Sequence, residues 1–282
     1  MKYYDLEDMF MKSVRETVNK DREKYENIKV IEHELMHMYL DWVNKSNEEL
    51  DGFTPMEYMA IVEKAGNLYD YVEYMLNTGR DVSDIATDRV VKRDDVVGFV
   101  KELLKSDEEN VLKYAFTVMF EVGGSDFIDV CIDLLCEGTE NKDKIGACYE
   151  YLAYDNEEAV EKLLEKMYNV DEKTQFLFAD ILSNYKNNEN IFMWLTTMLY
   201  RGEDLVDVAN MLGRYGDKKA CDLINSFVLD KNLNYNEFME LRNCVERLGG
   251  EFCYAKDFSE DEYYKLIVEK NKDIKNDNTE RS

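Results

Sequence analysis

The sequence predicts an all-α fold: an α-solenoid of about five helix pairs preceded by a separate N-terminal helical module. Pro55 is the only proline in 282 residues, so almost nothing interrupts a helix. Apolar residues recur at spacings of three and four, as in Val96, Val100, Leu103 and Leu104, and strand-like alternation is not sustained anywhere. After residue 90 the pattern itself repeats with a period near 30 residues. Such a period is typical of units built from two helices.

The repeat consists of two alternating sets of positions. The first set opens short helices at spacings of 32, 31, 32 and 29 residues: Val96, Ile128, Ala159, Ile191 and Ala220. The second set is centred on small residues that lie between them: Ala115, Cys148, Ala179 and Ala209. Because one helix pair cannot bury its apolar face alone, the pairs must stack on one another. The sequence therefore predicts a repeat domain over residues 91–255.

Two segments of this domain resemble the HEAT and armadillo-like repeat proteins. The closer is "LGRYGDKKACDLINSFV" (212–228), in which a helix ends in a glycine turn and an aspartate starts the next helix. "YLAYDNEEAVEKLLEKM" (151–167) has a comparable form, with Asp155 and Asn156 in the turn. The resemblance covers roughly residues 92–250 and implies an α-solenoid.

Residues 1–90 follow a different plan. Apolar spacing predicts two long helices, over residues 6–28 and 29–45. A third helix begins in "FTPMEY" (53–58), where Thr54 is the expected N-cap, Pro55 takes the first helical position and Glu57 completes a capping box. The sequence thus predicts an N-terminal helical module with at least one sharply specified helix start.

The stretch 41–58 also resembles a short pattern found in bacterial helical modules, including the toxin-binding domain of the Xre/MbcA/ParS antitoxins. The matching positions are Trp42, Asn47, Leu50, Gly52, Thr54 and Pro55. A helix, a turn and a capped helix account for all of them. The resemblance therefore implies a local structure and no particular activity.

Residues 256–282 are expected to form a C-terminal capping helix and a mobile tail. The helix is predicted from about Ser259 to Lys272, with Tyr263, Leu266 and Ile267 covering the end of the solenoid, as terminal repeats must. About eight residues at the end are expected to be mobile.

Composition narrows the classes of function. The chain has 61 acidic and 35 basic side chains, a net charge of −26, so its surface should repel nucleic-acid backbones and anionic membranes. No apolar run reaches the roughly 18 to 20 residues that span a bilayer, and the start lacks the basic and apolar regions of a secretion signal. We therefore expect a cytoplasmic protein. Its six cysteines include no C-x-x-C pair, which favours reduced core thiols.

The stretch "HELMH" (33–37) contains the only two histidines of the chain. On a helix His33 and His37 lie one turn apart on one face, with Glu34 placed to act as the general base of a zinc-dependent metallohydrolase. Glu63 is the candidate third ligand, since Glu57 is expected in the capping box. Residues 1–90 offer no β-sheet of the kind that zinc proteases use to hold substrate. Three alternatives therefore stay open: a catalytic zinc site, a structural or adventitious metal, and ordinary helix histidines, which we favour.

Four tyrosines recur in or just after the second helices of the repeat: Tyr149, Tyr154, Tyr185 and Tyr215. They could line a concave surface that binds a partner, or they could pack between repeats. The predicted function is an acidic protein-interaction scaffold or inhibitor, without a cofactor, whose partner is a basic protein. Such a partner could itself bind nucleic acid, which would make this chain an immunity or antagonist protein.

Overall fold

The structure is a computed structural model that describes residues 2–25, 27–154, 157–202 and 204–279. Throughout these ranges every regular element is a helix, which confirms the all-α class. The helices are α1 (Leu6–Lys20), α2 (Ile28–Val43), η1 (Glu48–Leu50), α3 (Pro55–Lys64), α4 (Leu68–Asn77), α5 (Asp84–Val90), α6 (Val96–Leu103), α7 (Glu109–Val122), α8 (Ser125–Cys136), α9 (Lys142–Ala153), α10 (Glu157–Lys166), η2 (Met167–Asn169), α11 (Glu172–Leu182), α12 (Glu189–Arg201), α13 (Leu205–Tyr215), α14 (Lys219–Asp230), α15 (Tyr235–Arg247) and α16 (Glu262–Thr279).

The chain divides into two compact units. The first comprises residues 1–130 with 140–147, and the second comprises residues 131–139 with 148–282. The two units are the parts of the chain with the most contacts within themselves. They do not test the predicted domain boundaries near residues 90 and 255, which stay predictions.

The first unit begins with α1 and α2, which pack against each other. The prediction of one helix over residues 6–28 is wrong, because α1 ends at Lys20 and Asp21 forms its C-cap. Asn27 then starts α2, accepting a hydrogen bond from the Lys29 backbone nitrogen. The charged segment between them offers no apolar side chain to bury until Tyr25, so packing does not extend the helix.

The predicted capping box at the start of α3 is confirmed. Thr54 Oγ1 accepts from the Glu57 backbone nitrogen at 3.1 Å, and Glu57 Oε2 accepts from the Thr54 backbone nitrogen at 2.8 Å. Just before it, Asn47 caps η1 and Leu50 is fully buried. The pattern over residues 41–58 is therefore accounted for by local structure.

The two sets of repeat positions fall in separate helices, in strict alternation. The first set lies in α6, α8, α10, α12 and α14, and the second in α7, α9, α11 and α13. All nine side chains are buried, with exposures of 4% or less. The periodic spacing thus marks the helix faces that form the core.

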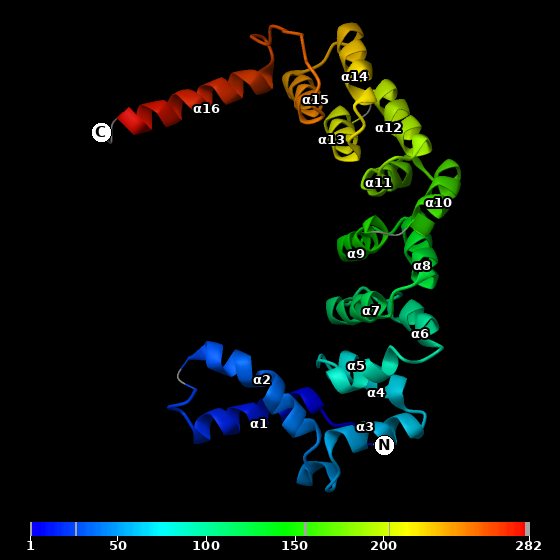
Figure 1. The fold of residues 1–282 in the computed structure, drawn as a ribbon, viewed down its shortest axis with the longest axis vertical. Coiled ribbons are helices and arrows are strands. Elements are labelled where there is room, and N and C mark those ends of the chain that lie inside the picture. Colours follow the sequence, from blue (N-terminus) through cyan, green and yellow to red (C-terminus); the bar gives the residue numbers. More distant parts are fainter. Residues whose placement is uncertain (1, 26, 155–156, 203, 280–282) are drawn as a thin grey trace. The chain divides into compact units, whose positions relative to one another are not determined.

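In the second unit α10, α12 and α14 form one row and α11, α13 and α15 form another (Figure 1). Helix α13 packs against both α12 and α15. Hydrogen bonds join residues about one period apart: Asn184 to Tyr149, Tyr185 to Leu152, Arg214 to Asp180 and Tyr215 to Asn188, at separations of 27 to 35 residues. These bonds join segments between residues 149 and 215 that lie about one period apart.

The C-terminal helix differs from its prediction in position and in packing. It begins at Glu262 and continues to Thr279, beyond the expected end at Lys272. Asp261 ties its start to α15 by accepting from the backbone nitrogens of Tyr264 and Tyr235. Tyr263 and Leu266, expected to cover the repeats, are at least half exposed. The predicted mobile tail overlaps α16 up to Thr279 and otherwise lies outside the described residues.

All six cysteines are free thiols, and four of them are buried. Burial raises the pKa of Cys244 to about 12, which keeps that thiol protonated and unreactive. Across the described ranges, none of the helices combines the length and apolar character needed to cross a bilayer.

Candidate functional site

Tyr149, the first of the predicted binding tyrosines, lies in a polar network on the second helices of the second unit. Its hydroxyl accepts hydrogen bonds from Arg214 Nη1 at 2.7 Å and Asn184 Nδ2 at 3.2 Å. Arg214 also forms an ion pair with Asp180, with 2.6 Å between Nη2 and Oδ1. All four side chains are only partly buried. This network therefore links α9, α11 and α13 and leaves part of its surface open to a partner.

Tyr185 and Tyr215 are engaged within the repeats. The Tyr185 hydroxyl donates to the carbonyl of Leu152. Tyr215 is 4% exposed, and its hydroxyl donates to the Asn188 carbonyl at 2.8 Å and accepts from the Asn188 nitrogen at 2.9 Å. Burial is the main cause of the raised pKa of Tyr215. These contacts correspond to the alternative interpretation, packing between repeats.

Tyr154 is the most accessible of the four tyrosines. Its side chain is 78% exposed at the end of α9. The structure thus separates the predicted set into an exposed member, a half-buried member in a polar network and two members that join repeats. The binding role of the four tyrosines stays a prediction. Tyr154 and Tyr149 are the two whose side chains are accessible at the surface.

Two arginines on this row of helices were missed by the sequence reasoning. Arg214 and Asn184 occupy equivalent positions in the matching segments "ANMLGRY" and "ADILSNY", and both donate to Tyr149. Arg247 of α15 lies across Gly213, where an added Cβ would come within 2.9 Å of Arg247 Nη1. The surface is therefore mixed in charge at this point, with the Arg214 charge balanced by Asp180. The internal match of the two segments was the signal that could have identified Arg214.

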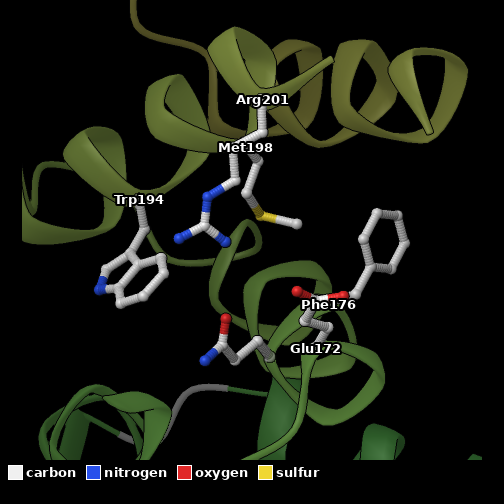
Figure 2. A pocket seen from close by; sticks show the side chains of 6 residues that line it. Glu172, Phe176, Trp194, Met198 and Arg201 are labelled. Carbon is white, nitrogen blue, oxygen red and sulfur yellow. The ribbon is translucent and has the colours of Figure 1, made fainter. Parts of the chain in front are cut away.

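A small hollow lies between α11 and α12, and Trp194, Met198 and Arg201 of α12 line one side of it (Figure 2). Its volume is about 20 Å³, room for roughly one water molecule. The Arg201 guanidinium lies 6.0 Å from the Trp194 ring centre, and the ring centre of Tyr168 lies 5.2 Å from that of Trp194. Trp194 and Met198 are buried, so Tyr168 and Arg201 are the members of this group that reach the surface.

The "HELMH" histidines lie on α2, and both are exposed. Glu34 accepts hydrogen bonds from Lys24 Nζ at 2.7 Å and from the Tyr25 hydroxyl at 2.9 Å. The bond from Lys24 is the main cause of the lowered pKa of Glu34, which is opposite to the shift expected of a general base tuned toward neutral pH.

Glu63, the proposed third ligand, forms an ion pair with Arg89 Nη1 at 2.6 Å. Among the residues that the structure describes, no three His, Cys, Asp or Glu side chains gather closely enough to hold a metal ion. The structure thus brings His33 and His37 onto one helix without adding Glu63 to them. Zinc hydrolysis stays an untested hypothesis.

Comparison with known protein families, curated proteins and solved structures finds no match to this chain. The likenesses to HEAT and armadillo repeats and to the antitoxin pattern therefore stay local resemblances of sequence. The function has to be argued from the side chains themselves.

Proposed function

We propose that this chain is a protein-interaction scaffold or inhibitor, a stack of helix pairs whose acidic surface docks a basic protein. The observation that carries the proposal is the exposure of large aromatic side chains on a strongly acidic helical surface. Tyr154 is 78% exposed and Tyr168 is 67% exposed, in a chain with a net charge of −26. Opposite charge steers the encounter of two proteins, and aromatic anchors contribute much of the affinity.

The hydrogen bonds between neighbouring repeats support the stacked architecture. Bonds such as Tyr215 to Asn188 and Arg214 to Asp180 recur at about one repeat length. In a repeat protein each unit contacts mainly its neighbours along the chain, and the stack presents an extended binding surface. A surface of this kind favours a protein partner over a small substrate.

The partner's chemistry follows from the charge. A protein that binds nucleic acid carries a basic surface of its own, and an acidic scaffold that covers that surface would block it. An immunity or antagonist function therefore fits the charge balance, with the partner's basic surface as the site that is covered.

A salt-dependent pull-down tests this proposal. Immobilised wild-type chain should recover a basic protein from extract, and the recovery should fall as the salt concentration rises. The variant Tyr154→Ala/Tyr168→Ala should weaken the recovered interaction by about tenfold, the loss expected for interface aromatics. The matched control Phe53→Ala removes a 44% exposed aromatic from the first unit and should behave as wild type.

Two outcomes would contradict the proposal. One is the recovery of no basic protein at low salt. The other is equal recovery by the wild type, the double variant and the Phe53→Ala control, since binding would then not use the exposed tyrosines.

A further inference from the structure

Helix α2 packs within the first unit by one face and turns the opposite face outward. On the packed face Trp42 is 7% exposed, and Tyr39 contacts Phe10 of α1 with ring centres 5.2 Å apart. The main neighbours of α2 within the unit are α1 and α3. The side of α2 away from Trp42 is the part of this helix that is open to a partner.

Four side chains form a stripe along this outward face, which we call the α2 stripe. His33, Met36, His37 and Leu40 follow one another at spacings of three, one and three residues, which places them on one side of a helix. All four are exposed, Met36 by 65% and Leu40 by 51%. The stripe contains no carboxylate, although the chain has a net charge of −26. Exposed apolar side chains gathered on one face mark a site of interaction.

The two histidines of the α2 stripe are suited to bind one metal ion. Residues four apart on a helix lie one turn apart on the same face, so their imidazole nitrogens can bind the same ion. Neither imidazole makes a hydrogen bond or an ion pair with the residues that the structure describes. A structural zinc ion almost always takes four ligands. His33 and His37 therefore supply half of a zinc site.

The other half does not come from the same chain, as far as the structure describes it. Glu34 accepts from Lys24 at 2.7 Å and from Tyr25 at 2.9 Å, and Glu63 is paired with Arg89 at 2.6 Å. No third His, Cys, Asp or Glu side chain of the described residues joins the two histidines. The remaining ligands must therefore come from outside this chain.

A second copy of the chain completes the site and covers the apolar side chains at the same time. Under two-fold symmetry the same surface of each copy meets the other, so two α2 stripes supply four imidazoles. Water molecules as the remaining ligands would leave Met36 and Leu40 exposed. An uncharged stripe with a doubly positive ion also reduces the repulsion between two copies that each carry a net charge of −26.

Charge favours one direction for the two helices. Lys29 precedes the α2 stripe, Asp41 follows it, and both are exposed. In an antiparallel pair the Lys29 end of one copy lies over the Asp41 end of the other, and His33 lies across from His37. A parallel pair would instead place like charges over one another, which is unfavourable.

We infer that a zinc ion joins two copies of this chain through antiparallel α2 helices. His33 and His37 of each copy are its four ligands, and Met36 and Leu40 are buried around it. Imidazole nitrogen is a ligand that zinc prefers, whereas calcium and magnesium prefer oxygen. The inference is independent of the proposed function, because the α2 stripe belongs to the first unit and the tyrosines proposed to bind a basic protein belong to the second.

Sedimentation of the full-length chain, freed of metal with a chelator and then titrated with zinc, tests the inference. Without added zinc the chain should be monomeric and hold little metal, because one α2 stripe supplies only half of the ligands. With zinc the mass should double, and the change should saturate at one zinc ion for two chains. Cobalt(II) in place of zinc should give the visible absorption of a tetrahedral site. Calcium should leave the chain monomeric, since it binds carboxylates and not imidazoles.

Two variants separate the metal from the apolar contact. His37→Ala leaves the symmetric site with two ligands and should abolish the zinc-dependent doubling of mass. Met36→Ser/Leu40→Ser keeps both histidines and should weaken the zinc-dependent dimer by at least about tenfold, because apolar burial is lost on both copies. The matched control Met193→Ser changes a 51% exposed methionine of α12 and should dimerise as wild type does. Far-UV circular dichroism checks that each variant is folded.

Four results would overturn the inference: a chain that stays monomeric with saturating zinc, a zinc-dependent dimer that persists in His37→Ala, the same dimer with calcium, and a Met36→Ser/Leu40→Ser variant that dimerises as tightly as wild type. The first two would exclude the histidine site. Dimerisation by calcium would assign the contact to carboxylates, and an unaffected serine variant would show that the stripe is not buried. None of these results bears on the pull-down, which uses the tyrosines of the second unit.

Discussion

The substitution Tyr215→Phe tests the two hydrogen bonds between the Tyr215 hydroxyl of α13 and the backbone of Asn188. It removes a single oxygen, which donates to the Asn188 carbonyl at 2.8 Å and accepts from the Asn188 nitrogen at 2.9 Å. The ring itself is kept, and with it the stacking on Phe192, whose ring centre lies 6.0 Å away. The change therefore tests the hydroxyl and not the packing of the aromatic side chain.

The size of the effect follows from these two bonds. Each contributes about 1 kcal/mol net, and a buried group left without a partner costs more. Asn188 is only partly buried, so water can replace some of the loss. We expect the free energy of unfolding to fall by about 1 to 2 kcal/mol. Hydrogen exchange at the Asn188 amide should accelerate as well, because that amide loses its acceptor.

Urea unfolding followed by far-UV circular dichroism measures the change. The urea concentration at the unfolding midpoint should fall. The slope of the unfolding free energy against urea concentration should stay constant, because unfolding exposes the same surface area in both proteins. The control Tyr200→Phe removes a hydroxyl from a half-exposed tyrosine of α12, and should change the free energy of unfolding by less than about 0.5 kcal/mol. If Tyr215→Phe is as stable as this control, the hydroxyl does not stabilise this contact and the reasoning is refuted.

Three further outcomes are expected. Thr54→Ala removes the side-chain half of the α3 capping box and should cost about 1 kcal/mol of stability in the same assay; an unchanged midpoint would contradict the cap. Burial raises the pKa values of Tyr39, Tyr69 and Tyr151 from 10.0 to about 12, so the stability they contribute is complete below pH 10 and is lost as the pH rises through 12. The tyrosinate absorbance, which reports ionisation, and the far-UV circular dichroism, which reports the helices, should then change over the same pH range. Full ionisation of the tyrosines in a protein that keeps its helices would contradict this link between ionisation and stability. Zinc analysis of the purified chain and of the variant His37→Ala should give the same substoichiometric content, whereas stoichiometric zinc lost in the variant would establish a metal site at "HELMH".

The core positions after residue 90 could be predicted from the sequence, because buried positions are occupied by apolar or small residues at a regular spacing. Ala115, Ala179 and Ala209 are small residues at matching places in α7, α11 and α13, and all three are buried. The α3 start was equally accessible, since Thr54, Pro55 and Glu57 act on one another within one turn. A helix cap depends on residues within one turn, and a buried helix face depends on the spacing of apolar residues along that helix. Both can therefore be predicted from a short stretch of sequence.

The end of α1 was less accessible. A run of charged residues near Lys20 is compatible with a helix, and only the lack of an apolar face to pack ends it there. The positions of Tyr263 and Leu266 were misjudged for a related reason. Their spacing on α16 predicts an apolar face, whereas the shorter ring contact with Tyr235 of α15 is made by Tyr264, at 5.0 Å, and that of Tyr263 is 6.4 Å.

The sequence alone determined that this chain is helical, that its buried positions recur about every 30 residues after residue 90 and that its composition is acidic, because each of these can be read along the chain. Only the tertiary structure decided which side chains meet. Arg214 reaches Tyr149 from 65 positions away, and Asn110 reaches the carbonyl of Leu76 from 34 positions away. Such meetings depend on how whole helices stack, and no local pattern specifies the direction in which a side chain leaves one helix to reach the next.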